Sequence, residues 1–196
     1  EEDAPFFFGR EGESEVITAN LLASRLTLLY GASGVGKSSV LRAGVIHHLQ
    51  KLSLQNLEDH GSPEFAVIAF SSWRDDPVHG LAVRVHEAVA RLLKDRIEPA
   101  ARDSLSLMEM LEWASGQVRG DLLIILDQFE EYFLYHARED GQGTFAIELP
   151  RAVNRRELRT SFLISIREDA LAKLDRFKGR IPNLFDNYLR IEHLDA

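Results

Sequence analysis

The most constraining feature of this sequence is a glycine-rich stretch, GASGVGKSS, that directly follows a short apolar run. The stretch covers residues 31–39 and matches the pattern G-x-x-x-x-G-K-[ST]. The run RLTLLY before it (25–30) predicts a strand, and apolar residues recur at helical spacing over 37–51. A strand, a tight loop and a helix in this order favour an alternating α/β fold.

Each residue type in the stretch suits the binding of phosphate groups. Glycines let consecutive backbone N–H groups turn inward toward phosphate oxygens, and the following helix adds its positive N-terminal end. Lys37 offers a charge to the β and γ phosphates, and the Ser38 hydroxyl can ligate Mg²⁺. We therefore predict a nucleotide site that contains Gly31, Ala32, Ser33, Gly34, Val35, Gly36, Lys37, Ser38 and Ser39.

Strands and helices alternate along the rest of the chain. Apolar runs predict further strands at 65–70, 122–126 and 161–166 and a last one within 187–194. Helices are expected at about 76–96, 104–115, 128–135, 144–158 and 168–177, and a polar loop at 53–64. Nearly continuous apolar strands separated by helices indicate a parallel sheet covered on both faces. No Pro/Gly/Ser-rich linker interrupts the pattern, so we expect one domain over residues 1–196.

Composition excludes several classes of protein. The formal net charge of −8 argues against a domain that coats nucleic acid, so a nucleic-acid partner is not expected. There is no cysteine and therefore no thiolate metal site. No apolar run approaches the roughly 18 residues that span a bilayer, and the acidic N-terminus is unlike a secretory signal. We expect a soluble, cytoplasmic chain with no membrane partner.

A second acidic group is expected at the end of another strand, on the metal side of the nucleotide. Asp127 directly follows the buried run LLIIL and is the natural candidate to share Mg²⁺ with Ser38. Its alternative role is that of a helix N-cap after the strand. The phosphate loop favours the metal role.

Hydrolysis also needs a group that orients or deprotonates the attacking water. The position after Asp127 is Gln128, which cannot accept a proton at neutral pH. Glu130 and Glu131 are the alternatives, three and four residues beyond Asp127 on the expected helix. The sequence does not decide between these two glutamates.

Arg167 ends the predicted strand SFLISI. Ligands of parallel α/β sheets lie at the carboxyl ends of the strands, where an arginine can bind the γ-phosphate of a triphosphate. The alternative is a surface ion pair with Glu168 or Asp169.

In this order, the segments PFFFGRE, GASGVGKSSVLRAGV, IILDQFEEYF and FLISIRED resemble the NTPase domain of the STAND ATPases, specifically the bacterial novel STAND type 1 branch. The resemblance covers the chain from about Phe6 to Leu194. It implies a P-loop NTPase, AAA+-like three-layer sandwich with a central parallel sheet in the order 5-1-4-3-2. It also implies that Gly9, Arg10 and Glu11 lie near the base or ribose, and that Arg167 is the γ-phosphate sensor.

The resemblance further implies that the chain is one part of a larger signalling switch. In such proteins ADP holds a closed monomer, and ATP permits oligomerisation, often in bacterial defence or cell death. We expect an ATP- and ADP-binding regulatory module with slow Mg²⁺-dependent hydrolysis, joined to effector and sensor domains and forming a homo-oligomer with ATP. The alternatives are a nucleotide-binding interaction platform without turnover, a small-molecule P-loop kinase, and a DNA-loading AAA+ ATPase of the replication-origin type. The last would need a more basic surface, which the net charge of −8 disfavours. The kinase would need a lid rich in arginine, whereas the segment after residue 70 offers only Arg74.

Overall fold

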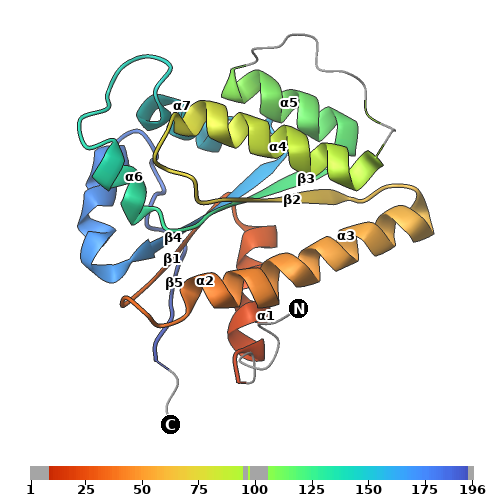
Figure 1. Cartoon of the computed structure of the whole chain (residues 1–196), viewed down its shortest axis with the longest axis horizontal. Helices are drawn as coiled ribbons and strands as arrows, with labels where there is room; N and C mark the ends of the chain where they lie inside the picture. The colour runs from red at the N-terminus through yellow and green to blue at the C-terminus, as the bar shows by residue number, and fades with distance from the viewer. Residues whose placement is uncertain (1–8, 95–96, 98–105, 194–196) are drawn as a thin grey trace.

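The computed structural model describes residues 9–94, 97 and 106–193. In this part of the chain, a sheet lies between two layers of helices (Figure 1). The strands are β1 (Leu26–Gly31), β2 (Phe65–Phe70), β3 (Asp121–Leu126), β4 (Thr160–Arg167) and β5 (Tyr188–Arg190). The helices are α1 (Glu11–Ala23), α2 (Lys37–Ser39), the π-helical η2 (Val40–Ile46), α3 (His47–His60), α4 (Pro77–Leu93), α5 (Leu107–Val118), α6 (Glu130–Tyr135), α7 (Phe145–Asn154) and the 3₁₀-helical η4 (Glu168–Phe177).

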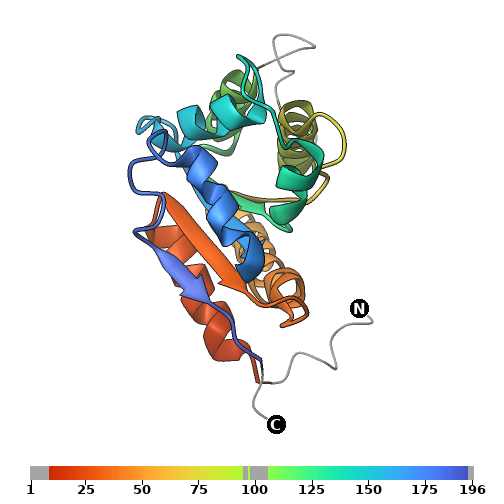
Figure 2. The same cartoon turned by 90° about the vertical axis from the view of Figure 1, so that its left-hand side faces the viewer.

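All strand pairs described in the sheet are parallel, and the order is β2-β3-β4-β1-β5. Read from the other edge, this is the predicted order 5-1-4-3-2, so the fold prediction is confirmed. Strand β4 lies between β1 and β3, and Figure 2 shows β5 alongside β1 at the sheet's edge. Because the strands are parallel, the loop after β1 and the ends of β4 and β3 lie together where the strands end, at the carboxyl edge of the sheet.

The two faces of the sheet bury separate apolar clusters because side chains alternate along each strand. On β2, Ala66 and Ile68 pack on the side of α4, α5 and α7, whereas Phe65 and Val67 pack on the side of α1, η2 and α3. Figure 1 shows these helices above and below the sheet. Within the described residues, no helix is long and apolar enough to cross a membrane.

Helices α4 and α5, which cover one face of the sheet, both begin with side-chain caps that the sequence encodes locally. The Asp76 side chain accepts hydrogen bonds from the backbone N–H groups of Val78 and His79, and Pro77 occupies the first turn of α4. At α5, Ser106 and Glu109 form a reciprocal capping box. These signals place α4 at its predicted start.

Several predicted boundaries were wrong. The segment 53–64 is not a loop, because α3 continues to His60 and ends at Gly61, whose φ is 72°. Its polar residues face solvent, except Ser53, whose hydroxyl donates to the Phe65 carbonyl over 2.6 Å. The helix expected over 144–158 ends at Asn154, and the one expected from Gln128 begins at Glu130. Residues 95, 96, 104 and 105 of two predicted helices lie outside the described residues.

Helix α1 was not predicted at all. Its hydrophobic periodicity is weak because the apolar residues Val16 and Leu22 lie on the exposed side of the helix. Only Ile17 and Leu21 are buried, against the face of the sheet that carries η2 and α3. Segment 168–177 is helical as predicted but 3₁₀ rather than α. Strand β5 is shorter than the expected 187–194, with three residues paired to β1.

Candidate functional site

The glycine-rich loop joins β1 to α2, as predicted. Gly34 and Gly36 have φ angles of 80° and 88°, in the left-handed region that favours glycine. Gly31 is required for another reason: a Cβ at this position would lie 2.4 Å from the backbone oxygen of Ile191. The first glycine therefore permits close contact between the loop and the chain that leaves β5.

Lys37 lies over the loop that precedes it. Its Nζ donates to the carbonyl oxygens of Gly31 and Ala32, both over 2.9 Å, and the residue is only 9% exposed. Burial lowers the pKa of Lys37 below its usual 10.5, while the nearby charges of Glu130 and Asp127 act in the opposite direction. The ammonium group is thus at the centre of the loop and within electrostatic range of both candidate acids.

Asp127 directly follows β3 and is 6% exposed. Its Oδ1 accepts a hydrogen bond from the Gln128 N–H over 2.9 Å. Its Oδ2 is buried and has no hydrogen-bond partner among the described residues. An unpartnered carboxylate oxygen in this position fits a cation, and oxygen ligands are those that Mg²⁺ prefers.

Ser38 is half-buried at the start of α2 and would be the protein's second oxygen ligand. In the described part of the chain, no group of three or more His, Cys, Asp or Glu residues could hold a metal by itself. This agrees with Mg²⁺ chemistry, because this ion usually binds one or two protein groups together with substrate phosphates and water.

The two glutamates left open by the sequence differ in position. Glu130 Oε2 accepts a hydrogen bond from the backbone N–H of Arg167 over 3.1 Å, and Glu130 is the charge that most raises the pKa of Lys37. No hydrogen bond or ion pair ties the side chain of Glu131 to any described residue. The geometry thus places Glu130 toward the loop. The turn before it contains Gln128 with a φ of 55°, an uncommon conformation for a residue other than glycine.

Arg167 ends β4 in register with Gly31 of β1. Its guanidinium forms a two-fold ion pair with Asp169, with contacts of 3.0 and 2.6 Å, and the side chain is 42% exposed. Its charge lowers the pKa of Lys37, so it lies within electrostatic range of the loop. The two contacts use Nε and Nη2, so Asp169 competes with a phosphate for two of the donors of the guanidinium.

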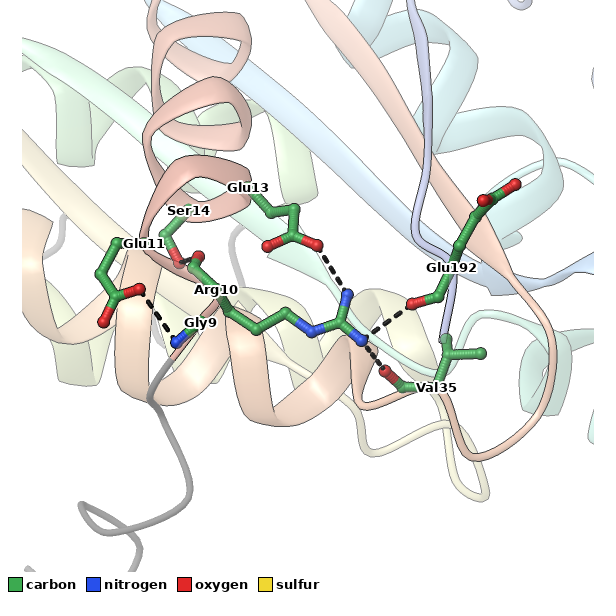
Figure 3. Close-up of polar contacts among 7 residues, drawn as sticks. All are labelled: Gly9, Arg10, Glu11, Glu13, Ser14, Val35 and Glu192. Atoms are coloured by element: carbon green, nitrogen blue, oxygen red, sulfur yellow. Dashed lines mark hydrogen bonds and ion pairs between the residues drawn. The ribbon is translucent and has the colours of Figure 1, made fainter. Parts of the chain in front are cut away.

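Arg10 links three parts of the chain (Figure 3). Its guanidinium donates to the backbone oxygen of Val35 in the loop over 3.1 Å and to that of Glu192 after β5 over 2.8 Å. It also pairs with Glu13 at 2.8 Å, and Arg10 is 6% exposed. The resemblance implied a place near the base or ribose. The structure places the guanidinium against the loop backbone.

Sequence reasoning missed the role of Trp73. Trp73 packs edge-on against Phe129 with a centroid distance of 5.0 Å, as an apolar core residue would. Its indole Nε1 also donates to the backbone oxygen of Asp127 over 2.7 Å. The signal was its position three residues beyond the predicted strand 65–70, at the same edge of the sheet as Asp127.

A phosphate-loop candidate after β1 and a buried acid after β3, in a parallel sheet of order 5-1-4-3-2, define a P-loop NTPase of the AAA+ type. The sequence identifies the family within this class, because the family model for Novel STAND NTPase 1 matches residues 1–194. The chain therefore belongs to this family, and the resemblance inferred from its motifs is confirmed. No curated protein matches the sequence.

Solved structures support the same fold. The Orc1 protein of Aeropyrum pernix, solved in complex with DNA, is 22% identical with a TM-score of 0.59 over 94% of this chain and 45% of that one. The ORC2 protein of Aeropyrum pernix, in ADPNP–ADP complexes, is 15% identical with a TM-score of 0.65 over 94% and 48%. A Walker-type ATPase of Pyrococcus abyssi is 16% identical with a TM-score of 0.61 over 96% and 55%. The chain thus spans about half the length of these proteins.

Proposed function

We propose that this chain is the nucleotide-dependent regulatory module of a cytoplasmic signal-transduction switch, which binds ATP and ADP with Mg²⁺ and hydrolyses ATP slowly. One observation carries the proposal: the buried, unpartnered Oδ2 of Asp127 lies at the sheet edge that also holds the ammonium group of Lys37. A carboxylate oxygen without a partner beside a phosphate loop is the arrangement that a Mg²⁺–nucleotide complex would complete.

The residues at this edge take distinct roles. Backbone N–H groups of residues 31–39 and Lys37 bind the β and γ phosphates. Ser38 and Asp127 hold Mg²⁺, which neutralises charge on the phosphates when bound. Glu130 orients the attacking water and accepts its proton, because it lies closer to Lys37 than its neighbour does. Arg167 binds the γ-phosphate in competition with Asp169.

Two features favour a switch over a rapid ATPase. The position after Asp127 holds an amide, so the candidate base, Glu130, lies two residues farther along the chain. Arg167 already has a carboxylate partner, which competes with a phosphate for its guanidinium. We expect the full-length protein to contain effector and sensor domains and to form a homo-oligomer with ATP, as in switches of bacterial defence or cell death.

The proposal is tested by measuring the affinities for ATP and ADP, with Mg²⁺ and with EDTA, alongside phosphate release. Lys37→Ala should abolish measurable nucleotide binding, and Asp127→Asn should remove the effect of Mg²⁺. Glu130→Gln should stop phosphate release while leaving ATP bound. Glu131→Gln is the matched control and should release phosphate as the wild type does. Unchanged nucleotide affinity in Lys37→Ala would show that the site is wrongly assigned.

A second candidate is an interaction platform that binds nucleotide without turnover. The two-fold ion pair between Arg167 and Asp169 favours it, because the Asp169 carboxylate competes with the nucleotide for the guanidinium at the end of β4. Wild-type protein that binds Mg²⁺–ATP but releases no phosphate over hours would select the platform. Asp169→Ala frees the guanidinium and should then produce phosphate release if this ion pair is what prevents turnover.

A further inference from the structure

Two buried oxygen atoms at the carboxyl edge of the sheet have no hydrogen-bond partner among the described residues. One is Oδ2 of Asp127, and the other is Oγ of Ser165. Asp127 is 6% exposed and Ser165 is fully buried. Since each lacks a partner, the two atoms do not bond to each other either. The roles proposed above use Asp127 and leave Ser165 without a function.

The register of β3 and β4 brings these two residues side by side. Leu126 pairs with Ile164, so the next positions, Asp127 and Ser165, are opposite each other. Beyond Asp127 the register shifts by one residue at Gln128, and the Phe129 N–H donates to the Ser165 carbonyl over 2.9 Å.

Both side chains also point to the same face of the sheet. Two residues earlier on each strand, Ile125 and Leu163 pack in the cluster on the side of α1, η2 and α3. Side chains two residues apart on a strand share a face, so Asp127 and Ser165 face the helix that begins at Lys37. Strand β4 carries Ser165 between Asp127 and the strand that enters the phosphate loop.

A third buried oxygen without a partner, at the other end of β4, serves as a comparison for the pair of Asp127 and Ser165. Thr160 Oγ1 is also unpartnered, but Thr160 lies at the opposite end of β4, in register with Leu122. Among the described residues, no unpartnered carboxylate oxygen lies at that end of the strand; the nearby Asp121 pairs with Arg159. An orphaned hydroxyl alone therefore identifies no ligand, whereas a hydroxyl next to an orphaned carboxylate oxygen, on the side of a phosphate loop, offers a donor and an acceptor to one group.

We propose that Ser165 is a positioning residue that, together with Asp127, holds one of the water molecules that Mg²⁺ keeps when it binds the nucleotide. Magnesium dehydrates reluctantly and retains several waters, and hydrogen bonds to such waters fix the ion's place. The Ser165 hydroxyl can both donate and accept, so it complements a carboxylate that only accepts. The inference rests on the proposed function and assigns to it a residue outside the predicted site.

The test compares Ser165→Ala with Thr160→Ala, which removes an equally orphaned hydroxyl from the far end of the same strand. Mg²⁺ is titrated into each protein saturated with a non-hydrolysable ATP analogue, and analogue affinity is measured separately in EDTA. Thermal melts without nucleotide show whether each variant is folded.

Ser165→Ala should lower Mg²⁺ affinity about tenfold or more, the effect typical of residues that support a metal site from its second shell. Its analogue affinity in EDTA should stay within about twofold of wild type, and its melting temperature should be unchanged or higher because an unpaired buried hydroxyl is removed. Thr160→Ala should leave Mg²⁺ affinity unchanged.

Equal Mg²⁺ affinity in Ser165→Ala and wild type would overturn the role of Ser165 and leave the proposed function standing. The same loss with and without Mg²⁺ would also overturn it, because it would indicate altered packing. If the wild-type protein does not bind the analogue, the proposed function itself fails.

Discussion

Replacement of Arg10 by alanine tests whether the N-terminal arginine holds the phosphate loop in place. The guanidinium makes three charge-assisted contacts, to Val35, Glu192 and Glu13, from a side chain that is almost fully buried. Arg10→Ala removes all three at once. It leaves the Val35 carbonyl, the most enclosed of the acceptors, without a donor.

The expected cost follows from these contacts. A hydrogen bond to a charged group contributes about 1.5–3 kcal/mol when buried, which applies to the Val35 carbonyl. The contacts to Glu192 and Glu13 are partly buried and contribute less. The freed side-chain entropy of an arginine returns up to about 2 kcal/mol. We therefore expect a net destabilisation of about 2–3 kcal/mol, which for a chain of this size lowers the melting temperature by about 4–12 °C.

Urea unfolding and thermal melts measure this change directly. The matched control is Arg84→Ala, which removes an exposed i,i+3 ion pair with Glu87 and should cost no more than about 1 kcal/mol. If Arg10→Ala unfolds within about 0.5 kcal/mol of wild type, Arg10 does not hold the loop. A contact between Arg10 and the base or ribose of the nucleotide, as the family resemblance implied, would then be the better explanation of its role.

Three further predictions concern the same edge of the sheet. Because burial lowers the pKa of Lys37 below 10.5, ATP affinity should fall with rising pH before 10.5 is reached, and Lys37→Arg should remove this fall in binding titrations. Gly31→Ala places a Cβ 2.4 Å from a backbone oxygen and should cost over about 2 kcal/mol in urea unfolding. Gly116→Ala, in α5 with nothing within 4 Å, should instead stabilise the protein by up to about 1 kcal/mol. Trp73→Phe leaves the buried Asp127 carbonyl without its donor and should cost about 1–3 kcal/mol, measured the same way.

The sequence predicted the parts of the fold that depend on local pattern. The apolar run 65–70 became β2 without a change of boundary, and the strand–loop–helix order around Gly31–Ser39 was confirmed. The strand order followed from the family resemblance rather than from spacing. Positions with strong local signals, such as the Asp76 cap before Pro77, were also predicted at the correct residue.

What the sequence did not reveal depends on contacts between distant segments. Helix α1 has two buried apolar residues, too few for a periodic signal, and it is held in part by the bonds of Arg10. The choice between Glu130 and Glu131 needed the backbone N–H of Arg167, which is 37 residues away. Ser165 could not be recognised, because its significance lies in its alignment with Asp127 across two strands.

The position of β1 has a consequence for the order in which this region is made on the ribosome. Both strands that flank β1 come late in the chain: β4 begins at Thr160 and β5 at Tyr188. The acceptor that Arg10 finds at Glu192 lies 182 residues downstream of it. During vectorial synthesis the glycine-rich loop therefore emerges well before the strands and carbonyls that fix it. We infer that the loop is fixed only after β5 and Glu192 have left the exit tunnel, when the bonds of Arg10 join the two ends of the described chain.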